Sequence, residues 1–125
     1  MTTLQLKNHQ VWQDLNEILE NLNPNSLVQK HLEKCCYTIN GYWDEQDQYY
    51  ESISLPHPIE AKLISSFVGV TEDKHFLKLQ FSLMNLLQNI GELVLIYNEN
   101  LELVDENWLL DIDSFLLDKK ISIQV

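Results

Sequence analysis

The first third of the chain repeats its apolar positions at helical spacing. The first run is Val11, Trp12, Leu15, Ile18, Leu19 and Leu22, with polar side chains between them. A spacing of three and four predicts an amphipathic helix, with Asn8 as its N-cap. Asn23-Pro24-Asn25 interrupts the pattern, and Ser26 with Gln29 then has the spacing of a capping box. This predicts a second, short helix with Leu27, Val28, His31, Leu32 and Cys35 on its apolar side.

After residue 36 the period changes to two. Apolar side chains alternate in two runs, which comprise Tyr37, Ile39 and Trp43, then Tyr49, Ile53 and Leu55. The polar segment 44–48 separates them, so the pattern predicts a β-hairpin. Residues 61–70 are predicted to be a third strand. A helix beginning at Pro58 is the alternative, because proline suits the first helical turn.

Residues 72–90 fit two patterns. One is a spacing of three and four through Phe76, Leu79, Leu83, Leu86 and Ile90, which is helical. The other is the alternation of Leu77, Leu79, Phe81 and Leu83, which is typical of a strand. We predict a helix, because the segment is long, lacks a turn signal and has almost no β-branched residues before Ile90. Gly91 would end it.

The last third predicts a strand at 92–97, a turn at 98–100 and an antiparallel return at 101–110. Asp111 or Asp113 then caps a last helix that runs to Asp118, and residues 121–125 either extend that helix or add an edge strand. The predicted fold is one α+β domain over residues 1–125, a mostly antiparallel sheet with helices packed on it. Its predicted order is a split helix, three strands, a helix, two strands and a helix.

The charge balance limits the partners that the chain can bind. Nineteen Asp and Glu face eight basic residues, all of them Lys, so the net charge is −11. This charge excludes nucleic acid and anionic membrane surfaces as partners, and it predicts a basic protein partner. No secretory signal or run of 18 apolar residues is visible, and adjacent Cys35 and Cys36 suit reduced thiols, one of them in the core. We therefore expect a cytoplasmic protein.

No motif predicts catalysis. The chain has no G-x-S-x-G, P-loop or dinucleotide fingerprint, so we expect neither an enzyme nor a cofactor. Asp44, Glu45, Asp47 and Glu51 suggest calcium, but an EF-hand starting at Asp44 would have Tyr49 and Leu55 at its sixth and twelfth positions. A calcium-binding regulator that uses the 44–51 loop remains an alternative function.

Aromatic side chains beside carboxylates indicate a protein-binding surface. The candidates in the predicted hairpin are Trp43, Asp44, Glu45, Asp47, Tyr49 and Tyr50. The C-terminal acids Asp105, Glu106, Asp111 and Asp113 are expected to cluster at one rim of the domain. Charges at a rim mainly tune the rate of association.

Three segments resemble the class I type III secretion chaperones: Ser82–Leu87, Glu92–Val104 and Asp113–Leu117. The resemblance implies a small acidic bacterial protein that forms homodimers and holds an unfolded stretch of a secreted effector. A short final helix and a long N-terminal helical region depart from that family. The expected function is non-enzymatic masking of a partner protein, basic or partly unfolded, with a homodimer as an expected assembly. The alternative is an immunity protein that neutralises a basic toxin.

Overall fold

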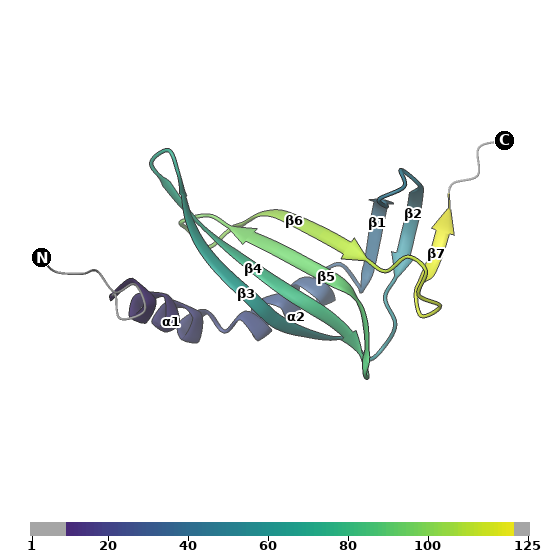
Figure 1. The fold of residues 1–125 in the computed structure, drawn as a ribbon, viewed down its shortest axis with the longest axis horizontal. Coiled ribbons are helices and arrows are strands. Elements are labelled where there is room, and N and C mark those ends of the chain that lie inside the picture. The colour runs from purple at the N-terminus through teal and green to yellow at the C-terminus, as the bar shows by residue number, and fades with distance from the viewer. Residues whose placement is uncertain (1–9, 122–125) are drawn as a thin grey trace, which may run out of the picture.

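The computed structural model describes residues 10–121, which form two helices and seven strands (Figure 1). The helices are α1 (Gln10–Leu22) and α2 (Pro24–Lys34). The strands are β1 (Thr38–Trp43), β2 (Tyr49–Ser54), β3 (Glu60–Thr71), β4 (Lys74–Asn85), β5 (Gln88–Tyr97), β6 (Leu103–Leu110) and β7 (Asp118–Ile121). Neither helix in this part of the chain has the length and apolar character to cross a membrane.

The strands form two antiparallel sheets. One has the order β1-β2-β7, and the other is the meander β3-β4-β5-β6. The helices lie along one face of the meander, and the three-stranded sheet stands at the end where β6 finishes (Figure 1). The tip of the β3–β4 hairpin extends beyond the other strands of the meander (Figure 1).

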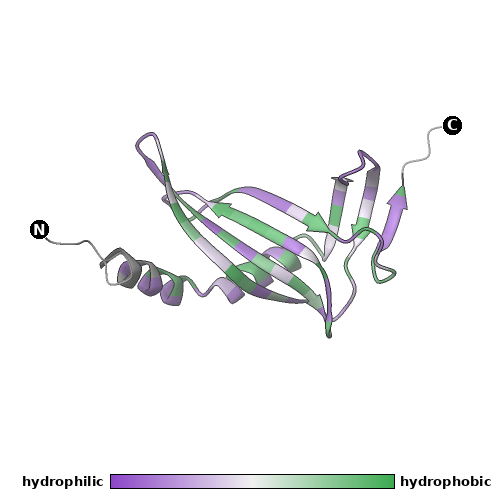
Figure 2. Ribbon diagram, in the orientation of Figure 1, coloured by the Kyte–Doolittle hydropathy of each residue, from purple (hydrophilic) through white to green (hydrophobic). Residues whose placement is uncertain are grey.

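Both sheets share one hydrophobic core. Alternate side chains along much of β4 and β5 are buried, and Figure 2 shows that hydrophobic and hydrophilic residues alternate along these strands. The cluster joins Val28 and Leu32 of α2, Phe81 and Leu95 of the meander, and Ile53 of β2. The α+β class with a mostly antiparallel sheet is therefore confirmed, as are the hairpin within 37–55 and the strand at 61–70. A helix beginning at Pro58 is not present.

The helix predicted for residues 72–90 is wrong, because this segment holds β4 and the start of β5. A two-residue turn at each end bounds the strand β4. Glu72 and Asp73 lie between the paired residues Thr71 and Lys74, and Leu86 and Leu87 lie between Asn85 and Gln88. Glu72 and Leu86 both adopt positive φ, at 57° and 55°, which tight two-residue hairpin turns require.

The last predicted helix is also wrong, so the predicted element order fails in two places. Residues 111–117 form turns around the buried Ser114, whose N–H donates to the Asp111 carbonyl at 3.0 Å. The Ser114 hydroxyl in turn accepts from the Leu116 N–H at 3.3 Å. The chain then pairs with β2 as edge strand β7, so the strand alternative for the C-terminal segment holds for Ile121. Residues 122–125 lie outside the described part.

Two details of the helices differ from the prediction. Asn23, rather than Ser26, is the N-cap of α2, and its side-chain oxygen accepts the Ser26 N–H at 3.3 Å. Cys35 is half-buried and Cys36 is exposed, so neither thiol lies in the core. The predicted cap of the first helix, Asn8, falls outside the described residues.

Candidate functional site: an acidic pocket

Asp44 organises the loop between β1 and β2. Its Oδ1 accepts the N–H groups of Gln46 and Gln48, each at 2.9 Å, and its Oδ2 accepts the Tyr50 hydroxyl at 3.1 Å. The hydrogen bond from the Gln48 N–H is the main cause that lowers the pKa of the Asp44 carboxyl below its usual value. The local fold therefore keeps Asp44 ionised and fixed in position.

Two tyrosines connect this loop to the meander. Tyr42 and Tyr50 face each other across β1 and β2, with ring centroids 6.4 Å apart. The Tyr42 hydroxyl accepts the N–H of Leu110, at the end of β6, across 3.1 Å. Burial is the main cause that raises the pKa of Tyr50, and the charges of Asp44 and Asp113 add to it. Segments that are far apart in the sequence therefore meet here.

A cavity of about 370 Å³ lies between the acidic loop, the adjoining ends of β5 and β6, and the turns after β6. Its lining contains five carboxylates and no basic residue. The lining residues are Tyr42, Asp44, Glu45, Gln46, Asn89, Gly91, Glu92, Leu109, Leu110, Asp111, Ile112 and Asp113. We call this cavity the acidic pocket.

The wall of the acidic pocket depends on a close approach of β5 to β6 at Gly91. A Cβ at this position would lie 2.4 Å from the Leu109 carbonyl oxygen, and φ is +151°. Next to it, Glu92 accepts the side-chain amide of Gln80 at 2.8 Å. Lys119 donates its amine to the Ile112 carbonyl and is not part of the lining. The pocket therefore combines a closely packed wall with five carboxylates, and one amine, that of Lys119, lies beside the lining at the Ile112 carbonyl.

The structure brings four of the ten predicted site residues into one cavity. Asp44 and Glu45 come from the β1–β2 loop, and Asp111 and Asp113 come from the turns after β6. The prediction missed a fifth carboxylate, Glu92, because the sequence pattern indicated only that it begins the strand at 92–97. Gly91 beside it was the available signal, since a glycine within a strand often marks a close approach of two backbones.

The other predicted residues of the hairpin lie outside the pocket. Trp43 and Tyr49 pack on each other with ring centroids 4.9 Å apart, and Trp43 is 62 % exposed. Tyr50 is buried beside the pocket and touches it through Asp44. Asp47 is exposed within the loop and does not line the cavity.

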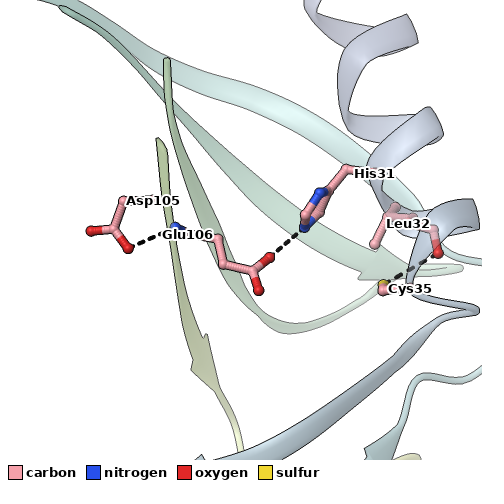
Figure 3. A network of polar contacts seen from close by, with 5 residues as sticks. All are labelled: His31, Leu32, Cys35, Asp105 and Glu106. Atoms are coloured by element: carbon pink, nitrogen blue, oxygen red, sulfur yellow. Dashed lines mark hydrogen bonds and ion pairs between the residues drawn. The ribbon is translucent and has the colours of Figure 1, made fainter. Parts of the chain in front are cut away.

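Asp105 and Glu106 also lie away from the pocket, in the middle of β6. The Glu106 carboxylate accepts a hydrogen bond from the His31 ring of α2, and Asp105 Oδ1 accepts the Glu106 N–H at 2.9 Å (Figure 3). The His31 ring also lies 6.2 Å from the Trp108 ring. This network joins α2 to β6, so the predicted rim of four C-terminal acids divides into two separate pairs.

No group of three His, Cys, Asp or Glu side chains within residues 10–121 has an arrangement that could hold a metal ion. Two residues of the loop proposed for calcium already have partners in the protein. Both oxygens of Asp44 accept hydrogen bonds, and Glu51 pairs with Lys120 at 3.5 Å. Within residues 10–121, the calcium alternative therefore has no cluster of three ligands behind it.

Comparisons with known proteins returned no match to a family model, a curated protein or a solved structure. Two of the three segments that resemble secretion chaperones were expected to be helical. Ser82–Leu87 instead ends β4 and enters a turn, and Asp113–Leu117 forms turns. The geometry of the acidic pocket is therefore the basis for a functional proposal.

Proposed function

We propose that the chain is a non-enzymatic protein-binding protein whose acidic pocket receives a basic segment of a partner protein and masks it. The observation that carries this proposal is the lining of the pocket, with five carboxylates and no Lys. A cavity of about 370 Å³ has room for a lysine or arginine side chain. A cationic partner would also be steered toward a chain of net charge −11.

The chemistry of the lining favours binding over catalysis. The pocket contains no Ser, Cys, His or Lys, and the pKa of Asp44 is lowered, whereas a carboxyl that acts as a general acid needs a raised pKa. Asp44 stays ionised because its own loop donates hydrogen bonds to it. A fixed carboxylate that remains charged suits recognition of a cation. We propose the cytoplasm as the compartment, because adjacent Cys35 and Cys36 suit reduced thiols.

The test compares two double variants with the same change of net charge. Glu45→Lys with Asp113→Lys reverses two charges in the pocket, and Glu17→Lys with Glu20→Lys reverses two exposed charges on α1. Each variant and the unmodified chain are used to capture partners from cells of the native host. We expect the unmodified chain and the α1 variant to retain the same basic protein, and the pocket variant to lose it.

Equal retention by the pocket variant, or an acidic protein as the retained partner, would contradict the proposal. The identity of the retained protein distinguishes the two versions of the proposal. A secreted effector would indicate a masking chaperone, and a toxin would indicate an immunity protein.

A further inference from the structure

The strand β3 is an edge strand with no charged side chain over residues 63–71. In the part of the chain that the structure covers, only β4 pairs with it. Ile64, Phe67, Val68 and Val70 are between 43 % and 62 % exposed. A long apolar edge offers unpaired backbone groups to another strand, and monomeric proteins usually protect such edges with charges.

The opposite edge of the same sheet is protected. Backbone groups in a strand alternate in direction, and the Asp111 N–H donates toward β5, to the Ile90 carbonyl. The N–H groups of Leu110 and Glu106 therefore point outward from β6. The Tyr42 hydroxyl and the Asp105 carboxylate accept them at 3.1 and 2.9 Å. The middle of β6 is also hydrophilic, as its purple colour in Figure 2 shows. Two outward N–H groups of β6 thus already have acceptors within the chain.

Two aromatic rings lie on the edge at β3. Phe67 and Phe76 are in contact, with ring centroids 5.9 Å apart. Gly69 makes room for this pair, because a Cβ there would lie 2.2 Å from Phe76 Cζ. The Phe67 ring remains 55 % exposed. Exposed aromatic rings beside small residues are typical anchors of protein interfaces.

We propose that β3 pairs antiparallel with β3 of a second copy of this chain, about a two-fold axis at Phe67. The two Phe67 rings would then meet, and the two meanders would form one continuous sheet. Counted from Phe67 and through the bulge between Leu63 and Ser65, this register brings Lys62 toward Glu72 in the turn that follows β3 of the second copy. The strand is therefore complementary to itself in charge, and its neutral centre lets two chains of net charge −11 approach.

This surface is independent of the proposed function, because no residue of β3 lines the acidic pocket. The charges on β6 argue against self-association at that edge. An antiparallel pair of β6 strands would place Asp105 and Glu106 of both copies along one interface. Like charges across paired strands are destabilising.

The test is the mass of the full chain in solution, by analytical ultracentrifugation at about 100 µM, where a micromolar Kd populates the dimer. We expect twice the chain mass of 14.7 kDa. Phe67→Lys with Val70→Lys should give a monomer, because both side chains are exposed, the lysines at position 67 would face each other across the axis, and the lysine at position 70 would enter the apolar edge of the second copy. Leu103→Lys with Val104→Lys, on the exposed part of β6, is the matched control and should remain dimeric.

A charge swap tests the register. Lys62→Glu would face Glu72 of the second copy, so the Kd of the dimer should rise several-fold. Adding Glu72→Lys should restore it. Hydrogen exchange of the β3 amides in the unmodified chain should also slow as its concentration rises. A monomeric unmodified chain, or a dimer that survives the Phe67 and Val70 changes, would overturn the interface. Failure of the swap to restore the Kd would overturn the two-fold axis at Phe67.

Discussion

The hydroxyl of Tyr42 accepts a hydrogen bond from the backbone N–H of Leu110 across 3.1 Å, and both residues are buried. Tyr42 belongs to the three-stranded sheet and Leu110 ends the meander. Both residues line the acidic pocket, so this bond fixes the two halves of the pocket to each other.

We expect Tyr42→Phe to lower the free energy of unfolding by about 1–2 kcal/mol, because the buried Leu110 N–H would lose its acceptor. Tyr37→Phe is the matched control. Its hydroxyl accepts the Gln29 side-chain amide at 2.7 Å in an exposed setting, so we expect a loss of less than about 0.5 kcal/mol. Urea unfolding measures both values. Equal losses of unfolding free energy in the two variants would show that the buried hydrogen bond between the sheets stabilises the fold no more than the exposed one does.

Alanine substitutions at two glycines with positive φ distinguish the energetic cost of the backbone conformation from the cost of close packing. Gly91→Ala would place a methyl group 2.4 Å from the Leu109 carbonyl oxygen, whereas at Gly41 the nearest atom, Tyr49 Oη, lies 3.4 Å away. We expect Gly91→Ala to cost about 2–4 kcal/mol and Gly41→Ala about 1 kcal/mol. Thermal unfolding compares them. A similar cost at both positions would mean that the wall of the pocket can move apart without loss.

The lowered pKa of Asp44 predicts a dependence of stability on pH. In the unfolded chain this carboxyl takes up its proton near the ordinary value of 3.8, before it does so in the folded chain. Its contribution to stability is therefore complete above that value, and it is lost as the pH falls through the folded pKa. The stability advantage of the unmodified chain over Asp44→Asn should be constant near neutrality and should shrink in acid. Unfolding across a pH series measures it, and a difference that is the same at both ends would contradict the assignment.

Association with the captured basic partner should slow as salt rises. Steering by a net charge of −11 acts over long range and is screened by ions, so we expect the association rate to fall about tenfold from low to physiological salt. Asp113→Lys should slow association more than Asp105→Lys, because only Asp113 lines the pocket. Stopped-flow kinetics across a salt series measures both effects. A rate that does not depend on salt would contradict electrostatic steering.

Alternation was the reliable signal in this sequence, and length was the misleading one. Leu77, Leu79, Phe81 and Leu83 alternate as β4 requires, and all four are buried. The helix was preferred because no Gly, Pro or Asn-Gly marked a turn. In the structure the turn after β4 has Leu86 and Leu87 at its centre, 74 % and 98 % exposed. Such a turn depends on its tertiary context. Asn85, for example, donates its side-chain amide to the Pro58 carbonyl at 2.7 Å.

The composition of the acidic pocket could be predicted in part, but its assembly could not. The sequence shows acids at 44–47 and at 105–113, without any indication of which of them meet. Docking of β1 against the end of β6 joins Asp44 and Glu45 to Asp111 and Asp113. The same sequence pattern cannot show that α2 places His31 over β6 and so engages Glu106 elsewhere.

The pairing of β7 with β2 has a consequence for the order in which the chain folds. The strands of the meander follow one another through short connections, so their contacts close small loops. The three-stranded sheet instead requires Ser54 of β2 to pair with Asp118 of β7, which is far from it in the sequence. During synthesis, the meander can therefore form while the chain is still on the ribosome. The hairpin of β1 and β2 pairs with β7 only later, after β7 has been synthesised. Because the turns before β7 supply Asp111 and Asp113, the pocket is completed only after these turns emerge.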